Sequence, residues 1–196
     1  MEIQIRRKTI FTVLGLIGII VLVFLFSRLY QNQLRPVKTI YLGNMPFSFR
    51  RDIRKALEVE VFPKEELFHD LFRDFQTRNI TILFKAGTPE TNALSQIQTF
   101  ELTYKLFRYD DITRGAIRPK KTFSAKEVGS YENITREEGV LKIILVPPEF
   151  SEETRVTAGG NRIWIYGKTE KEFDLVTMRA ILSIMNITSI EGLVNQ

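Results

Sequence analysis

The feature that most constrains this chain is an uncharged, apolar run near its N-terminus, residues 9–27 (TIFTVLGLIGIIVLVFLFS). Basic side chains flank the run on both sides, at Arg6, Arg7, Lys8 and Arg28. Because a helix rises about 1.5 Å per residue, the run is long enough to cross the hydrocarbon core of a bilayer. The sequence therefore predicts a transmembrane helix over residues 9–29, after a tail of residues 1–8.

A cleaved signal peptide and a buried core helix are the alternatives to an anchor. A signal peptide has a shorter apolar core and a small-residue cleavage site, which residues 27–31 (SRLYQ) do not offer. A core helix of this length normally keeps one polar side, and this run has none. The chain contains no cysteine, so a lipoprotein anchor is excluded. The predicted partner of residues 9–29 is therefore the lipid bilayer.

Two features predict how the chain is oriented in the membrane. The Arg6-Arg7-Lys8 cluster favours a cytoplasmic N-terminus under the positive-inside rule. Three N-x-[ST] sequons, at Asn79, Asn133 and Asn186, are possible glycosylation sites unless these short motifs are coincidental. Together they predict a single-pass protein of the cell membrane whose C-terminal domain lies outside the cytoplasm.

Charge and cysteine content limit the function of the soluble part. The formal net charge is +5, but residues 1–29 carry four basic residues and one acidic residue, which leaves about +2 for the rest. This balance gives no indication of a nucleic-acid partner. The absence of cysteine rules out disulfides and thiol chemistry, and it suits a prokaryotic envelope protein.

Hydrophobic periodicity predicts one α/β (or α+β) sandwich domain with a mixed sheet over residues 37–196, after a linker of residues 30–36. A hairpin is expected around Gly43-Asn44 and another around Gly159-Gly160. Further strands are expected at residues 57–61, 80–84 and 140–146. Helices are expected at residues 64–75, 89–108 and 170–186, whereas residues 109–139 show no regular pattern.

The apolar side chains of the predicted helices recur at helical spacing, and we interpret them as core. In the helix over residues 89–108 they are Ala93, Ile97, Phe100, Tyr104 and Phe107. In the helix over residues 170–186, which begins with a capping box at Thr169 and Glu172, they are Phe173, Val176, Ala180, Ile181 and Ile184.

No catalytic, cofactor-binding or metal-binding residue is predicted. The single histidine, His69, has no nucleophile elbow to accompany it, and it is interpreted as a half-buried or surface side chain. The pairs Asp110-Asp111 and Glu137-Glu138 lack EF-hand spacing and are interpreted as solvated loop charge. A Ser–Lys dyad leaves no sequence signature and stays open.

A basic loop is the best candidate for a functional surface. Residues 114–121 (RGAIRPKK) hold four cations, Arg114, Arg118, Lys120 and Lys121. Such a cluster can contact anionic lipid or a polyanionic envelope polymer, although charged loops are more often simply solvated.

Three stretches resemble segments of uncharacterised archaeal surface proteins with a single membrane anchor. They are VKTIYLGNMPFSFRRDIRKALEVEVFP (residues 37–63), FELTYKL (residues 100–106) and IWIYGKTEKEFDLVTMRAILSIM (residues 163–185). The resemblance covers most of the soluble domain, and it implies an extracytoplasmic, cysteine-free domain bearing sequons. It implies no activity, so no functional residue follows from it.

Two function classes are consistent with this sequence. The first is a non-enzymatic binding or structural module of the cell envelope, with a protein or polymer partner. The second is a membrane-tethered hydrolase or transferase with a Ser/Lys or carboxylate site. An enzyme should have a concave site of convergent polar groups near residues 85–88 or 147–149, whereas a binding module should have a flat apolar or charged patch.

Overall fold

The computed structural model describes residues 21–22, 37–115 and 118–191. The chain divides into two compact units, Met1–Pro36 and Val37–Gln196. Within the described part of the chain, no helix combines the length and the apolar character needed to cross a bilayer. The predicted tail, membrane span and linker lie outside the described residues, apart from the helical pair Val21 and Leu22.

The second unit is an α/β domain built on a six-stranded mixed sheet, as the periodicity predicted. Its strands, in spatial order, are β3 (Val61–Phe62), β7 (Arg155–Gly159), β8 (Arg162–Tyr166), β6 (Val140–Val146), β4 (Asn79–Lys85) and β5 (Thr122–Val128). The last four run parallel to one another, while β7 is antiparallel to β8 and parallel to β3. The short hairpin of β1 (Thr39–Leu42) and β2 (Met45–Ser48) forms a separate two-stranded sheet.

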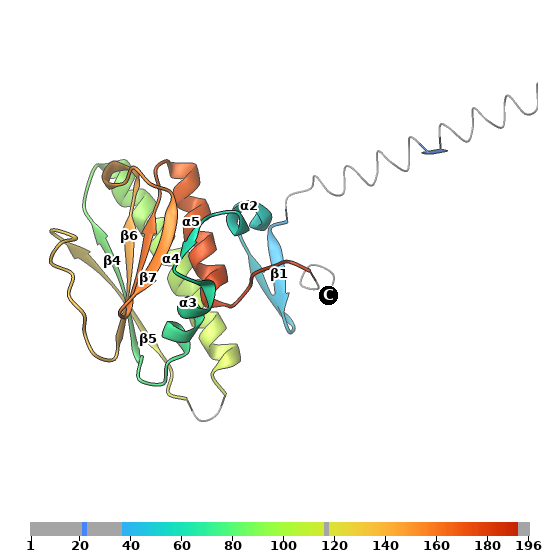
Figure 1. The fold of residues 1–196 in the computed structure, drawn as a ribbon, viewed down its shortest axis with the longest axis horizontal. Coiled ribbons are helices and arrows are strands. Elements are labelled where there is room, and N and C mark those ends of the chain that lie inside the picture. Colours follow the sequence, from blue (N-terminus) through green and yellow to red (C-terminus); the bar gives the residue numbers. More distant parts are fainter. Residues whose placement is uncertain (1–20, 23–36, 116–117, 192–196) are drawn as a thin grey trace, which may run out of the picture. The chain divides into compact units, whose positions relative to one another are not determined.

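Four helices share the main core with one face of the sheet, and Figure 1 shows this helical layer. They are α2 (Ile53–Leu57), α3 (Glu65–Arg73), α4 (Pro89–Thr113) and α5 (Glu170–Ile184). The strands contribute alternate side chains to this core, among them Ile82, Ile143 and Ile165. The expected apolar side of α5 is confirmed, because Phe173, Val176, Ala180, Ile181 and Ile184 are all buried.

The other face of the sheet is covered by a loop instead of a helix. We call this the open face, because a loop and not a helix lies on it. Residues 129–139 connect β5 to β6 across it, and Ile134 packs there against Leu83 and Ile144. The Tyr131 hydroxyl donates a hydrogen bond to the Leu145 carbonyl at 2.6 Å, and burial raises the pKa of Tyr131 to about 12. The β4–α4–β5 connection crosses the helical face and the loop returns across the opposite face, so both connections have the same hand.

Two local predictions were wrong. The strand expected over residues 57–61 is replaced by the end of α2 and the two-residue β3. The Asp52 side chain accepts the Arg54 amide at 3.2 Å, and this N-cap directs Ile53 and Ala56 into the core. Strand β5 lies inside the segment for which no element was expected, because its side chains are mostly exposed and give no apolar alternation.

Candidate functional site

The exposed side of α4 carries a stripe of large apolar side chains. Ile97, Phe100, Tyr104 and Phe107 have exposed fractions of 38%, 67%, 48% and 39%. Ala93 is exposed as well. These five residues are the ones that periodicity assigned to the core, so that prediction was wrong. Helix α4 instead turns Leu102, Leu106 and Tyr109 toward the sheet.

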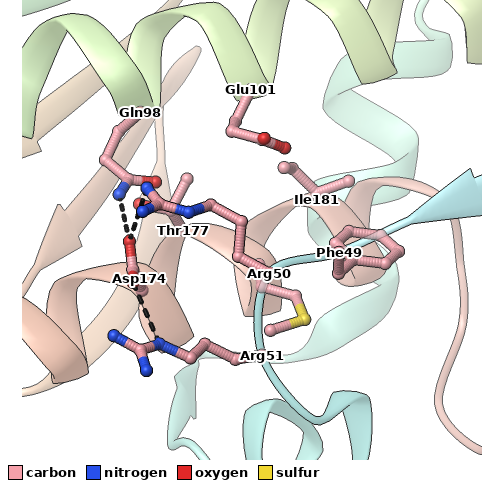
Figure 2. Close-up of a pocket in the computed structure, with 9 residues that line it drawn as sticks. Phe49, Arg50, Arg51, Gln98, Glu101, Asp174, Thr177 and Ile181 are labelled. Atoms are coloured by element: carbon pink, nitrogen blue, oxygen red, sulfur yellow. Dashed lines mark hydrogen bonds and ion pairs between the residues drawn. The ribbon is translucent and has the colours of Figure 1, made fainter. Parts of the chain in front are cut away.

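The buried side of α4 is unusually polar, and a cluster around Asp174 of α5 accounts for part of it (Figure 2). The Asp174 carboxylate accepts hydrogen bonds from Gln98 Nε2 at 2.6 Å and from Arg51 Nε at 3.1 Å. Arg50 lies at 3.8 Å from the same carboxylate. A buried carboxylate with these partners is well satisfied, so Gln98 can face inward at little cost.

Lys105 is the second buried polar group of α4. Its ammonium pairs with Glu101 one turn earlier and lies 4.9 Å from the centre of the Phe49 ring. Burial lowers the pKa of Lys105 to about 8. The cavity lined by Phe49, Glu101 and Asp174, among others, measures about 20 Å³, which is enough for one water molecule. We therefore assign this cluster a structural role in joining α4, α5 and the segment before α2.

The structure separates the four cations of the predicted basic surface. Lys121 is buried, and its ammonium donates a hydrogen bond to the Thr77 carbonyl. Lys121 is therefore not part of the predicted basic surface. Lys120 is exposed, and Arg114 lies 3.9 Å from the Asp111 carboxylate at the end of α4. Arg118 is partly exposed beside the two residues that the structure does not describe.

Cations also border the apolar stripe itself. The Lys120 ammonium lies 4.1 Å from the centre of the Phe107 ring. The Arg108 guanidinium lies 5.4 Å from the Tyr104 ring and 5.5 Å from the Phe47 ring of β2. We call Ile97, Phe100, Tyr104 and Phe107, together with Arg108 and Lys120, the α4 face. Sequence reasoning missed Arg108, although its i,i+4 spacing from Tyr104 was a usable signal.

Residues 85–88 and 147–149, the strand ends at which a site is expected if the protein is an enzyme, make structural contacts instead. The Glu149 carboxylate accepts the Thr88 amide at 2.8 Å, at the N-terminus of α4. This hydrogen bond lowers the pKa of Glu149. Lys85 lies 4.5 Å from the centre of the Phe150 ring. The polar groups at these ends therefore hold the loops together.

A groove lies on the open face of the sheet, between strands β4 and β5 and the covering loop. Its volume is about 490 Å³, and Ser124 and Lys142 are among its lining residues. The Ser124 hydroxyl lies 3.2 Å from the Thr81 hydroxyl. The Lys142 ammonium donates to the Thr135 carbonyl at 2.9 Å and pairs with Glu137 at 3.1 Å. Each group thus has its own partner, and the two are not joined as a dyad.

All three sequon asparagines are exposed. Asn79 begins β4 and its side chain accepts the Thr122 hydroxyl. Asn133 lies in the covering loop and lines the groove. Asn186 follows α5 with a φ of 58°, a left-handed conformation that asparagine tolerates. Exposure is a requirement for modification, so all three stay candidate sites.

His69 has a structural role. Its Nδ1 lies 3.0 Å from the Ile184 carbonyl at the end of α5, which fits an N–H donor on that nitrogen. Across residues 37–115 and 118–191, no group of three or more His, Asp or Glu side chains is arranged to hold a metal ion.

Comparison with protein-family models, with curated proteins and with solved structures finds no match. The function is therefore argued from the residues of this chain alone.

Proposed function

We propose that this protein is a single-pass membrane protein whose C-terminal domain is a binding or structural module of the cell envelope, outside the cytoplasm. The observation that carries the proposal is the α4 face, with its exposed aromatic and aliphatic side chains. Soluble domains rarely expose a contiguous apolar stripe without a binding role. The polar groups at the strand ends, in contrast, are engaged in the contacts of Glu149 and Lys85.

The anchor and its orientation rest on the sequence. The uncharged run over residues 9–27 is long enough for a membrane span, and the basic cluster before it favours a cytoplasmic N-terminus. Exposure of the three sequon asparagines is consistent with glycosylation outside the cell.

A membrane-tethered hydrolase or transferase is the alternative, and the groove on the open face is where it would act. Ser124 would be the nucleophile and Lys142 the base, which requires Lys142 to leave Thr135 and Glu137. A serine-directed phosphonate probe tests this directly. Labelling that is lost in Ser124→Ala and kept in Ser130→Ala would favour the enzyme and overturn the binding-module proposal.

The proposed location is tested by protease treatment of whole cells that express the full chain with a C-terminal tag. We expect external protease to remove the tag from intact cells, together with a glycan-dependent loss of gel mobility. Asn133→Gln and Thr135→Ala destroy the same sequon from its two ends, so both should remove the same increment of mass. A tag that is cleaved only after lysis would place the domain in the cytoplasm and overturn the proposal.

A further inference from the structure

We propose that the α4 face lies against the surface of the bilayer in which the chain is anchored, with its rings at the level of the lipid headgroups. This inference rests on the proposed anchor, and it assigns a lipid surface as the partner of one defined side of the domain. Arg108 and Lys120 contact lipid phosphates in this arrangement, and Phe100, Tyr104 and Phe107 enter the interface.

The first argument is the composition of the exposed side of α4. Between Thr91 and Asp110, the exposed residues are Ala93, Gln96, Ile97, Phe100, Tyr104 and Phe107, and none of them is charged, whereas the exposed acidic residues Glu90 and Asp111 lie near the two ends of α4. The Phe100 and Tyr104 rings stack with centres 5.9 Å apart. From Ile97 to Phe107 the stripe extends along about 15 Å of helix axis. A helix with this surface can lie in the plane of the membrane interface, where aromatic rings are favoured.

The second argument is the charge that borders the stripe. The Lys120 ammonium lies over the Phe107 ring and the Arg108 guanidinium lies over the Tyr104 ring, so both cations are held at the border of the stripe. Phosphates of a bilayer complement such cations. A second copy of the domain would instead present the same two cations, because the acidic side chains near the stripe, Glu101 and Asp111, are already paired with Lys105 and Arg114. The charge pattern thus favours lipid over self-association.

The third argument is the length of the tether. The predicted linker of residues 30–36 spans at most about 25 Å when fully extended, at roughly 3.6 Å per residue. The first element after it, the β1–β2 hairpin, contacts α4 directly, because Arg108 lies 2.9 Å from Met45 Sδ and stacks on Phe47. The tether therefore attaches to an element that packs against the α4 face.

The test uses the full chain in vesicles of phosphatidylcholine and phosphatidylglycerol, with and without bromine on the acyl chains. The only tryptophan, Trp164, packs on the open face of the sheet, so Trp164→Phe gives a background without indole fluorescence. In this background, Phe100→Trp places the reporter on the α4 face. Phe62→Trp is the matched control, since Phe62 is similarly exposed (62%) but belongs to β3, the opposite edge of the sheet from β5.

We expect the indole at position 100 to emit at a shorter wavelength than the indole at position 62 in both kinds of vesicle, and we expect brominated lipid to quench position 100 and leave position 62 unchanged. Adding Phe107→Glu should abolish the quenching at position 100. Equal emission of the Phe100→Trp protein in both kinds of vesicle would overturn the inference. A blue shift without quenching, accompanied by a cross-linked dimer, would overturn it in favour of a second copy.

Resistance to alkaline carbonate extraction tests the anchor separately. If carbonate releases the chain, the proposed anchor fails, whereas the quenching result still decides whether the α4 face contacts lipid.

Discussion

Helices α4 and α5 pack against each other in the same layer, yet they bury opposite kinds of surface. Helix α5 has an unbroken run of buried residues from Val176 to Met185, and its apolar side chains fill the core. Helix α4 buries Ser95, Gln98 and Lys105 and leaves Phe100 exposed to solvent. The difference teaches that a polar side chain can face inward when a partner is available there, as Asp174 is for Gln98.

The largest expected effect comes from replacing one phenylalanine in each helix by alanine. Phe173→Ala should lower the free energy of unfolding by about 3 to 5 kcal/mol, because Phe173 is fully buried. Phe100→Ala, at an exposed site, should change it by no more than about 0.5 kcal/mol. Urea denaturation of both variants measures the contrast. Similar losses in the two would mean that the α4 stripe is packed in solution.

The hydrogen bond between Gln98 of α4 and Asp174 of α5 provides the second test of the comparison. Asp174→Leu removes the acceptor of the buried Gln98 amide and should cost about 2 to 3 kcal/mol. Adding Gln98→Leu removes the unpaired amide, so the double variant should recover much of that loss. A double variant that is less stable than Asp174→Leu alone would show that the polar contact itself fixes the orientation of α4. Chemical denaturation at neutral pH gives both values.

The stability of the folded chain should depend on pH because α4 buries Lys105. Because burial lowers its pKa to about 8, the folded chain releases this proton at lower pH than the unfolded chain does. Stability should therefore rise as the pH increases from 8 to 9.5, by about 2 kcal/mol at 1.36 kcal/mol per pKa unit. Denaturation midpoints across this range measure the rise. Lys105→Met should reduce the rise and leave the part that comes from Lys121, whose pKa burial also lowers, whereas an unchanged rise in that variant would assign the whole effect to another group.

The helix caps should give the smallest difference. Thr88 Oγ1 accepts the Thr91 amide at 3.3 Å, and Thr169 Oγ1 accepts the Glu172 amide at 3.2 Å. Replacing either threonine by alanine should cost about 1 kcal/mol. Thermal unfolding of both variants compares them. A much smaller cost at Thr88 would indicate that the N-terminus of α4 is held mainly by Glu149.

Sequence patterns correctly predicted the elements whose apolar residues give a single possible buried side. The run VLKIILV became β6, and the pattern of Phe173 and Val176 gave both the extent and the buried side of α5. In α4 the pattern is ambiguous, because Leu102 and Leu106 form a second apolar side opposite Phe100. The hydrogen bond between Gln98 and Asp174, 76 residues apart in the chain, satisfies a polar group on the side that faces inward, and no local pattern indicates it.

The candidate site was predictable in part. The basic loop indicated the region, and Lys120 does border the α4 face. Lys121 could not be distinguished from its neighbour by sequence, since its burial depends on the position of the Thr77 carbonyl in a distant turn. The aromatic residues of the site were identified as a group and assigned to the wrong environment.

The strand order also determines when the domain can fold during synthesis. Strand β3 leaves the ribosome long before its partner β7, and β6 obtains its second neighbour only when β8 has been made. Helix α5, which packs against β7 and β8, is made after all six strands. A nascent chain that stops before Glu170 therefore lacks the helix that contacts Val156 of β7 and the Ile163 and Ile165 side of β8, so the domain depends on completion of α5 to escape aggregation.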